Sequence, residues 1–317
     1  MCRAAHRQEK VLRHLAILSL LIAPAAAAQT MSQADLLRRM IDLDRLATPP
    51  PPGERSGLFS SYDRAAHTIE EGRFTRWDAN EDAGQFLRSA DGWDVWAEMD
   101  APGVVNRLWV SEPDGTVRIE LDGRAVVEAP MAELFKGGVE PFGEPLAYRA
   151  AARGGWNLYS PIGYARSCRI SSRGFAGAYQ VDYTALPASL APRTFTGELD
   201  DEAREALKDV RRTFEDGLPL ARSTMALAFQ QDIEPGGRLA ETLTGRKEGE
   251  PTSEVAGTVR GLYVSLTDRL EPRDAYALHQ CVLRIWFDGR KAPHIEAPLS
   301  DFFGSGFDRE PFNALFT

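Results

Sequence analysis

The sequence is poor in the residues that build metal and redox centres. Of 317 residues, 3 are cysteine and 5 are histidine, and the histidines lack the spacing of metal ligands. The two cysteines beyond the N-terminal segment, Cys168 and Cys281, are too few for a disulfide framework or a zinc site. Each begins an apolar run, so we expect two buried free thiols. We expect no metal and no cofactor.

The sequence also lacks a basic segment and two common catalytic signatures. Lysine and arginine number 37 against 46 aspartate and glutamate residues, which gives a formal net charge of -9. This acidic balance excludes a nucleic-acid backbone as a partner. Neither a Gly-x-Ser-x-Gly elbow nor a glycine-rich phosphate loop occurs, which excludes serine hydrolases of that type and nucleotide hydrolases.

Long apolar runs are missing, apart from a short one at residues 15–22. Four basic residues precede this run, and Pro24 and a string of alanines follow it. A basic start, a short apolar stretch and an Ala-x-Ala end are typical of a secretory signal peptide, and the run is too short to span a bilayer. We therefore expect cleavage near Ala28, a secreted or periplasmic protein, and no membrane partner after cleavage. The alternative, an amphipathic first helix, fits less well because the run is apolar all round.

What the sequence does contain is the composition of a β-rich globular protein. The hydrophobic fraction is 43%, and 27 glycines and 20 prolines are spread along the chain, which indicates a packed core and many turns. Short alternating segments predict an antiparallel β-sandwich of jelly-roll type, with tight hairpin turns at Asp114-Gly115 and Asp122-Gly123. The expected strands are Trp93–Met99, Val104–Val110, Val117–Leu121, Val126–Glu128 and Ala178–Tyr183.

Two helical segments and a spacer divide the chain. Ser32 and Asp35 predict a capped helix over 32–46, which prolines 49–52 end. Acidic residues predict the start of a second helix near Asp200, which continues to about Asp216. Strand texture returns at 220–230. The expected order is a signal peptide (1–28), a helix with a proline-rich spacer (29–53), a first jelly-roll module (54–187), a connecting segment (188–252) and an incomplete second jelly-roll module (253–317).

The most informative feature is an internal repeat in three blocks that keep their order. Only fourteen residues follow the last block, whereas the first copy continues for about fifty, so we expect a fragment or a truncated gene product. Equal alternation and equal turns predict the same strand pairing in both copies. The matching blocks are 103–111 with 257–265, 117–124 with 283–290, and 127–135 with 295–303.

At this point the sequence resembles glycoside hydrolase family 172, the former domain of unknown function 2961. The resemblance covers about residues 54–317 and is specific in the combination of its motifs. It implies tandem jelly rolls, trimer-based homo-oligomers similar to viral capsid proteins, and activity on fructofuranosides or arabinofuranosides. The motifs are Ser60-Ser-Tyr-Asp-Arg64, Asp78-Ala-Asn80, Gly155-Trp-Asn-Leu-Tyr-Ser-Pro-Ile-Gly-Tyr-Ala-Arg-Ser-Cys168 and Glu296-Ala-Pro-Leu-Ser-Asp-Phe-Phe-Gly304.

The family's catalytic turn has no counterpart between Gly304 and Thr317. The resemblance therefore implies that a catalytic glutamate lies beyond Thr317, or that the site uses other acids. Glycoside hydrolysis usually needs two carboxylates, and Glu296 and Asp301 flank a proline turn after a strand, so they are the candidate catalytic pair. A structural turn role is the alternative for both.

Three further residues are candidates for substrate binding. Asp78 and Asn80 have side chains suited to vicinal hydroxyls, although their spacing also fits a loop capped by its own side chains. Trp156 follows two glycines in an expected surface loop, where its ring can stack on a sugar; the other tryptophans are mostly expected in the core. The prediction is an exported carbohydrate-active protein of the furanoside-cleaving kind. The alternative is a non-catalytic jelly-roll module that binds glycan or builds an assembly.

Overall fold

The computed structural model describes part of the chain. Residues 1–29, which include the expected signal peptide, and most of the strand expected at 220–230 lie outside the described residues, and residues 228–230 are not a strand. The described ranges are 30–65, 67–68, 74–76, 78–150, 154–216, 228–234, 236–243, 257–259, 261–264 and 279–304.

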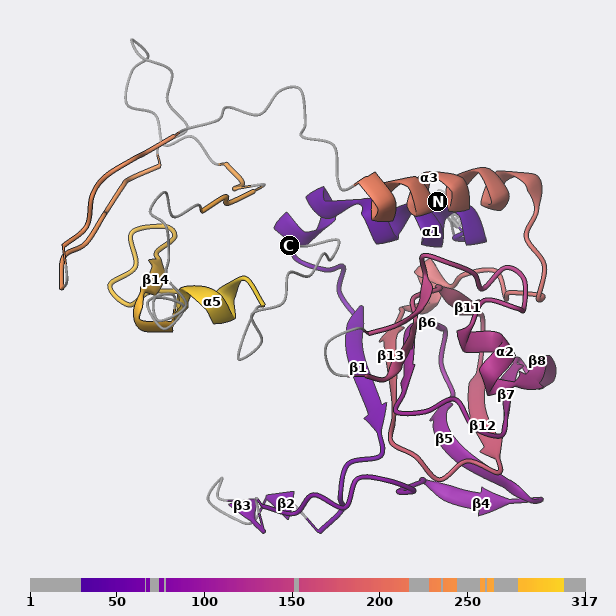
Figure 1. The fold of residues 1–317 in the computed structure, drawn as a ribbon. Helices are drawn as coiled ribbons and strands as arrows, with labels where there is room; N and C mark the ends of the chain where they lie inside the picture. The colour runs from indigo at the N-terminus through magenta and orange to yellow at the C-terminus, as the bar shows by residue number, and fades with distance from the viewer. Residues whose placement is uncertain are drawn as a thin grey trace, which may run out of the picture.

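Two antiparallel sheets pack face to face (Figure 1) and confirm the predicted mainly-β sandwich. Their strand orders, β1-β13-β6-β10 and β5-β12-β7-β8, are those of a jelly roll. The first sheet contains β1 (Arg55–Ser60), β13 (Tyr179–Ala185), β6 (Gly103–Val110), β10 (Trp156–Leu158), β9 (Ala147–Arg149) and β11 (Ile162–Tyr164), which also pairs with β6. The second contains β4 (Arg88–Ala90), β5 (Trp93–Met99), β12 (Cys168–Arg173), β7 (Thr116–Leu121) and β8 (Arg124–Pro130), and the short strands β2 (His67–Thr68) and β3 (Phe74–Thr75) pair separately.

An aromatic cluster fills the space between the sheets. Trp96 is fully buried and stacks on Tyr179, with ring centroids 4.8 Å apart. Phe175 lies on the same indole at 5.0 Å. The indole Nε1 donates a 2.8 Å hydrogen bond to the Ser172 hydroxyl, so the polar atom of this large side chain is satisfied.

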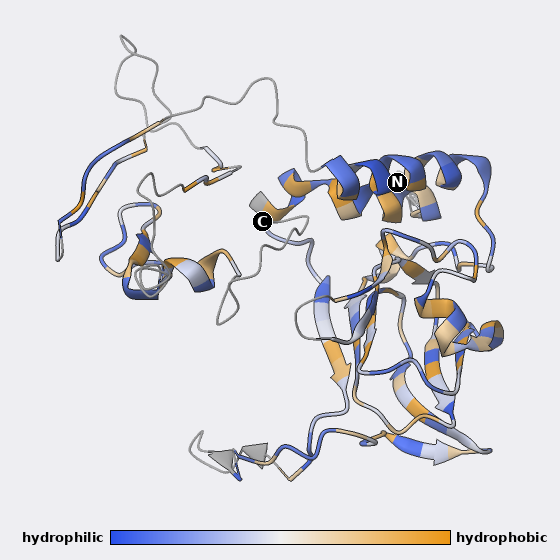
Figure 2. Ribbon diagram, viewed as in Figure 1, coloured by the Kyte–Doolittle hydropathy of each residue, from blue (hydrophilic) through white to orange (hydrophobic). Residues whose placement is uncertain are grey.

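Two helices pack against each other at one end of the sandwich (Figure 1). Helix α1 (Gln33–Ile41) begins with the predicted capping box of Ser32 and Asp35 and continues as a 3₁₀ turn. Helix α3 (Asp201–Asp216) is capped by Asp200, whose carboxylate accepts the Ala203 N–H at 2.8 Å. Figure 2 shows the polar side of α3 turned outward and its apolar side turned toward α1. No helix in the described ranges is both long and apolar enough to cross a bilayer.

The C-terminal hairpin repeats part of the sandwich in its pairing. Strands β14 (Val282–Ile285) and β15 (Ile295–Pro298) lead into helix α5 (Leu299–Phe302), as β7 and β8 lead into helix α2 (Met131–Phe135). The registers agree position by position, because Arg284 pairs with Glu296 as Arg118 pairs with Glu128. The predicted equal pairing is therefore confirmed for the second and third blocks of the repeat.

Other predictions differ from the structure. Asp122-Gly123 forms the tight β7–β8 turn with positive φ at both residues, but Asp114-Gly115 joins strands of different sheets, so the hairpin predicted there is wrong. Of the two free thiols, Cys168 is buried as expected, whereas Cys281 is exposed because it precedes a hairpin that is itself largely exposed. The described residues of 257–264 form no strand, unlike their counterpart β6.

Candidate functional site

Glu296 lies on the exposed side of the C-terminal hairpin. Its carboxylate is 2.9 Å from the Arg284 guanidinium, and both side chains are about half exposed. The first hairpin has the same ion pair at the same register, with Arg118 Nη2 2.8 Å from Glu128. The ion pair of Glu296 therefore has a counterpart in the first hairpin, and Glu128 is the matched position against which a catalytic role of Glu296 can be tested.

Asp301 lies in the first turn of α5, beside a histidine and a serine. His279 Nδ1 is 2.7 Å from the Ser300 hydroxyl and 3.7 Å from the Asp301 carboxylate. Serine and aspartate thus approach the same ring nitrogen. A nucleophilic triad needs them on opposite nitrogens, so this cluster does not have that geometry. Asp301 remains a candidate proton donor.

Asp78 and Asn80 are exposed in a turn that two neighbouring aspartates hold in place. Asp63, which is 7% exposed, accepts the Ala65 and Glu81 N–H groups. These two hydrogen bonds, that from Ala65 first, hold the pKa of Asp63 below its usual range. Asp82 in turn accepts the Asp63 N–H at 2.8 Å. The carboxylates of Asp63 and Asp82 therefore tie the Ser60–Arg64 motif to the residues that follow Asn80, while Asp78 and Asn80 themselves are exposed.

Trp156 is not in a loop but begins strand β10, where it pairs with Val110. Directly opposed residues of an antiparallel pair share a face, so the half-buried indole lies on the core side of the sheet, at its margin. The Lys136 ammonium lies 5.5 Å from the ring centroid. The prediction that Trp156 lies in a surface loop is wrong, because strand pairing continues through the residue after the glycines.

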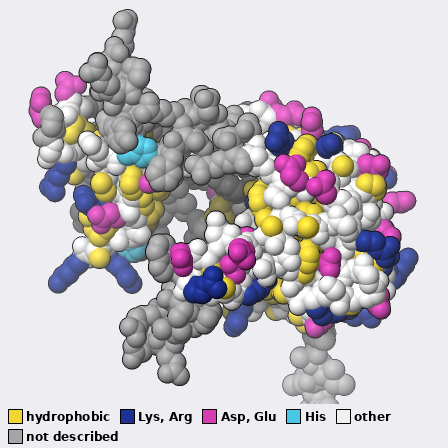
Figure 3. All heavy atoms as spheres, turned by 60° about the horizontal axis from the view of Figure 1, so that its bottom comes forward, with side chains coloured by type: hydrophobic (Ala, Val, Ile, Leu, Met, Phe, Trp, Pro, Cys, Tyr) yellow, Lys and Arg dark blue, Asp and Glu magenta, His cyan; other side chains and the backbone are white. Residues whose placement is uncertain are grey.

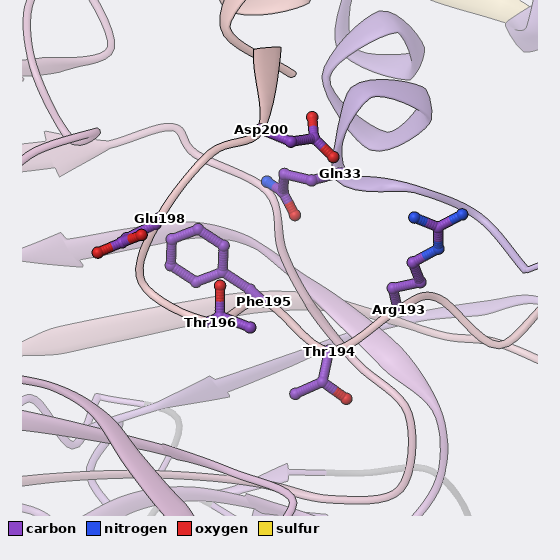
Figure 4. Close-up of a pocket in the computed structure, with 7 residues that line it drawn as sticks. All are labelled: Gln33, Arg193, Thr194, Phe195, Thr196, Glu198 and Asp200. Carbon is purple, nitrogen blue, oxygen red and sulfur yellow. The ribbon is translucent and has the colours of Figure 1, made fainter. Parts of the chain in front are cut away.

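Two of the hollows on the described part of the chain are small and open to solvent. One, of about 170 Å³, lies between the first turns of α1 and α3 and the segment 193–198 (Figure 4). Two of its polar groups have structural partners, since Gln33 Nε2 donates to the Pro161 carbonyl and Asp200 caps α3. The buried Gln33 Oε1 has no hydrogen-bond partner among the described residues. The other, of about 120 Å³, is lined by residues such as Glu98, Glu120 and Arg169.

The outer face of the β4-β5-β12-β7-β8 sheet is a ladder of opposite charges. Glu98 accepts from Arg169 at 2.8 Å and from Arg88 at 2.5 Å, and these arginines, Arg88 first, hold the pKa of Glu98 below its usual range. Acidic and basic side chains are likewise interspersed over the surface in Figure 3. Because these charges pair with one another, the face is suited to solvation rather than to chemistry on a substrate.

The outer face of the other sheet has a different character. In one row across the strands, Gln180 lies opposite Trp109, Trp109 opposite Asn157, and Asn157 opposite Tyr148. In the next row, Asp182 lies opposite Arg107. Leu108 and Val110 point into the core, so alternation places both rows outward. We call Arg107, Trp109, Tyr148, Tyr159, Gln180 and Asp182 the aromatic–polar face.

Arg107 is the centre of the aromatic–polar face. It donates from Nη1 to Asp182 at 2.7 Å and to Gln180 at 2.9 Å, and from Nε to Asn157 at 3.1 Å. Its guanidinium lies 5.7 Å from the centroid of the Tyr159 ring. The network fixes the guanidinium plane by bonds to the two strands that flank β6, β10 and β13, which is how a sheet holds polar groups in a set orientation.

Two tyrosine rings complete the aromatic–polar face. Tyr148 and Tyr159 lie nearly parallel, at 6° with centroids 6.2 Å apart, and Tyr148 is 39% exposed. Burial, followed by the neighbouring Tyr159, raises the pKa of Tyr148. Gly155 has φ +81°, and a Cβ there would meet the Trp109 indole at 2.4 Å, so the glycine lets that ring lie against the backbone.

Sequence reasoning missed this face. Its members come from β6, β9, β13 and the residue that follows β10, and the residues on any one strand look like ordinary solvent-facing positions. The available signal was the outward positions of 103–111 and 178–183, where arginine, tryptophan, glutamine and aspartate alternate with core residues. Which strands lie side by side in a jelly roll had to be known before these positions could be joined.

The strand orders of the two sheets define this protein as a jelly-roll β-sandwich protein. Residues 52–203 match the family model of the GH172 first beta-sandwich domain. This match confirms the resemblance to glycoside hydrolase family 172 over residues 52–203, and it indicates a carbohydrate-active protein of the glycoside hydrolase kind. No match is found among curated proteins.

Proposed function

We propose that this protein is exported and acts on furanoside linkages, of the fructofuranoside or arabinofuranoside kind. The observation that supports this most is the family 172 sandwich at residues 52–203. The C-terminal unit β14–β15–α5 repeats the β7–β8–α2 unit of that sandwich, with one candidate acid, Glu296, on β15 and the other, Asp301, in α5. One carboxylate would protonate the leaving oxygen, and the other would act as nucleophile or base.

The roles of Glu296 and Asp301 are tested by substitution. We expect Glu296→Gln and Asp301→Asn to lower kcat on aryl arabinofuranosides or fructofuranosides by about 100-fold or more, since each removes an acid–base or nucleophilic group. Release of the aryl group measures the rate. The matched control is Glu128→Gln, which removes the equivalent ion pair in the first hairpin.

The control variant should keep the wild-type rate. Equal rates in all three variants would show that Glu296 and Asp301 are structural. A wild-type chain that releases no aryl group from either substrate would refute the furanosidase proposal for this chain.

Export is tested in the producing cell. We expect mature protein outside the cytoplasm to begin near Gln29, because the first 28 residues have the pattern of a cleaved signal peptide. Fractionation followed by mass spectrometry of the N-terminal peptide gives the answer. An intact Met1 terminus in the cytoplasmic fraction would contradict it.

A second candidate function is a glycan-binding or assembly module, in trimer-based homo-oligomers. The aromatic–polar face favours this candidate, because rings beside oriented polar groups suit contact with a partner rather than bond cleavage.

A further inference from the structure

We propose that the aromatic–polar face is a carbohydrate-binding site, separate from the acids of the C-terminal hairpin. The proposal rests on the proposed function in one respect only, the furanose-containing glycan chosen as the ligand. The site itself is assembled from β6, β9 and β13 of the sandwich and from Tyr159, which follows β10.

The aromatic side chains give the site its stacking surface. A sugar ring has an apolar side of C–H groups and a rim of hydroxyls, so it stacks on flat rings and hydrogen-bonds at its edge. Tyr148 and Tyr159 present nearly parallel rings, and Tyr148 is 39% exposed. Tyrosine combines such a ring with a polar tip, which suits a ligand that is apolar on one side and wet at its edge.

The polar side chains supply hydrogen bonds that the protein does not use. Arg107 donates from Nε and Nη1, and among the described residues no acceptor is bonded to its Nη2. Only one oxygen of the 37%-exposed Asp182 carboxylate accepts from Arg107. A guanidinium donor and a carboxylate acceptor held side by side match the alternating donors and acceptors of vicinal hydroxyls.

The charge of the face selects among ligands. Arg107 and Asp182 form an ion pair at 2.7 Å, so the face carries no excess charge that would attract a phosphate or a uronate. The ligand that fits is a neutral oligosaccharide. On the outer face of the other sheet, Glu98 is bonded to Arg88 and Arg169, and Glu128 to Arg118. This face is therefore a suitable negative comparison.

The experiment measures binding of neutral oligosaccharides to the full chain by calorimetry. The probes are linear arabinofuranose and fructofuranose oligosaccharides, with a β-linked glucose oligosaccharide for comparison. We expect Tyr148→Ala and Asp182→Ala each to raise Kd by about tenfold, through lost stacking and a lost charged acceptor respectively. The matched controls are Tyr62→Ala, an exposed tyrosine elsewhere, and Glu128→Ala, an arginine-paired carboxylate on the other sheet.

The outcomes separate this proposal from its alternatives. Both controls should keep the wild-type Kd, and all variants should keep the wild-type melting temperature. No binding of any probe up to about 10 mM, or equal Kd in face and control variants, would overturn the site. A changed oligomeric state with unchanged Kd would show a subunit interface instead and would also overturn it. If the wild-type chain binds the oligosaccharides but does not hydrolyse them, the binding site is supported and the furanosidase proposal is refuted. If the chain hydrolyses them and the face variants bind as tightly as wild type, the furanosidase proposal is supported and the binding site is refuted.

Discussion

Trp96→Ala is expected to lower the free energy of unfolding by about 3–5 kcal/mol, which is the usual cost of removing a buried aromatic side chain. Trp96 on β5 is 0% exposed and contacts Tyr179 on the facing sheet and Phe175 in the loop between β12 and β13. Its loss also leaves the buried Ser172 hydroxyl without its indole partner. Because domain stability is typically only ~5–15 kcal/mol, this variant should be close to unfolding. Chemical denaturation followed by far-UV circular dichroism measures the change.

Trp286→Ala is the matched control for that experiment. Trp286 is 49% exposed at the end of the C-terminal hairpin, so its removal should change the free energy of unfolding by no more than about 0.5 kcal/mol. If both variants lowered the free energy of unfolding by the same amount, the stacked rings around Trp96 would not stabilise the core more than an exposed tryptophan stabilises the hairpin.

Asp122→Ala is expected to destabilise the sandwich by about 3 kcal/mol, since hydrogen bonds to a charged group contribute more than neutral ones. The Asp122 carboxylate accepts the Arg166 and Ser167 N–H groups at 2.8 and 2.9 Å and the Thr194 hydroxyl. We expect this loss to come from the broken hydrogen bonds and not from the backbone conformation of the turn. Asp288 has the same φ of 52° and also precedes a glycine. Asp288→Ala therefore changes only the conformational preference of a turn, and it should lower the free energy of unfolding much less than Asp122→Ala.

The same aspartate predicts a dependence on pH. Burial pushes the pKa of Asp122 up, but hydrogen bonds from Thr194, Ser167 and Arg166 outweigh it, so the pKa lies below its usual range. A carboxyl whose pKa is lower in the folded state stabilises the fold above its unfolded pKa of about 3.9. That contribution is lost as the pH falls through the folded pKa. Asp122→Asn should therefore flatten the loss of unfolding free energy below about pH 4, and an unchanged slope would contradict this role.

Local patterns predicted the elements well where the chain alternates or is capped. Strand β5 begins and ends at the predicted residues, and α1 has the predicted capping box of Ser32 and Asp35. The internal repeat also predicted the register of β14 with β15. These features depend on residues close together in sequence, and local physical chemistry is sufficient for them.

The candidate site was harder to predict, because it depends on distant pairings. Asn157 lies between Trp109 and Tyr148 only because β10 inserts between β6 and β9. Trp156 looked like a loop residue after two glycines, yet the pairing of β10 turns it to the core side. The connection at Asp114-Gly115, which leads from one sheet to the other, was predicted as a hairpin for the same reason. A turn dipeptide gives no information on which sheet the next strand joins.

The two matching hairpins also bear on how the chain folds in time. Register, ion pair and left-handed Asp-Gly turn recur in β14–β15 although its surroundings differ from those of β7–β8. These features are therefore encoded within about twenty residues, and a contact set of such short range can close in microseconds. The β1–β13 pairing, which joins Arg55 to Ala185, requires closing most of the sandwich sequence into one loop. Hairpin formation should thus precede closure of the sandwich, with the β7–β8 unit as an early template onto which β12 adds.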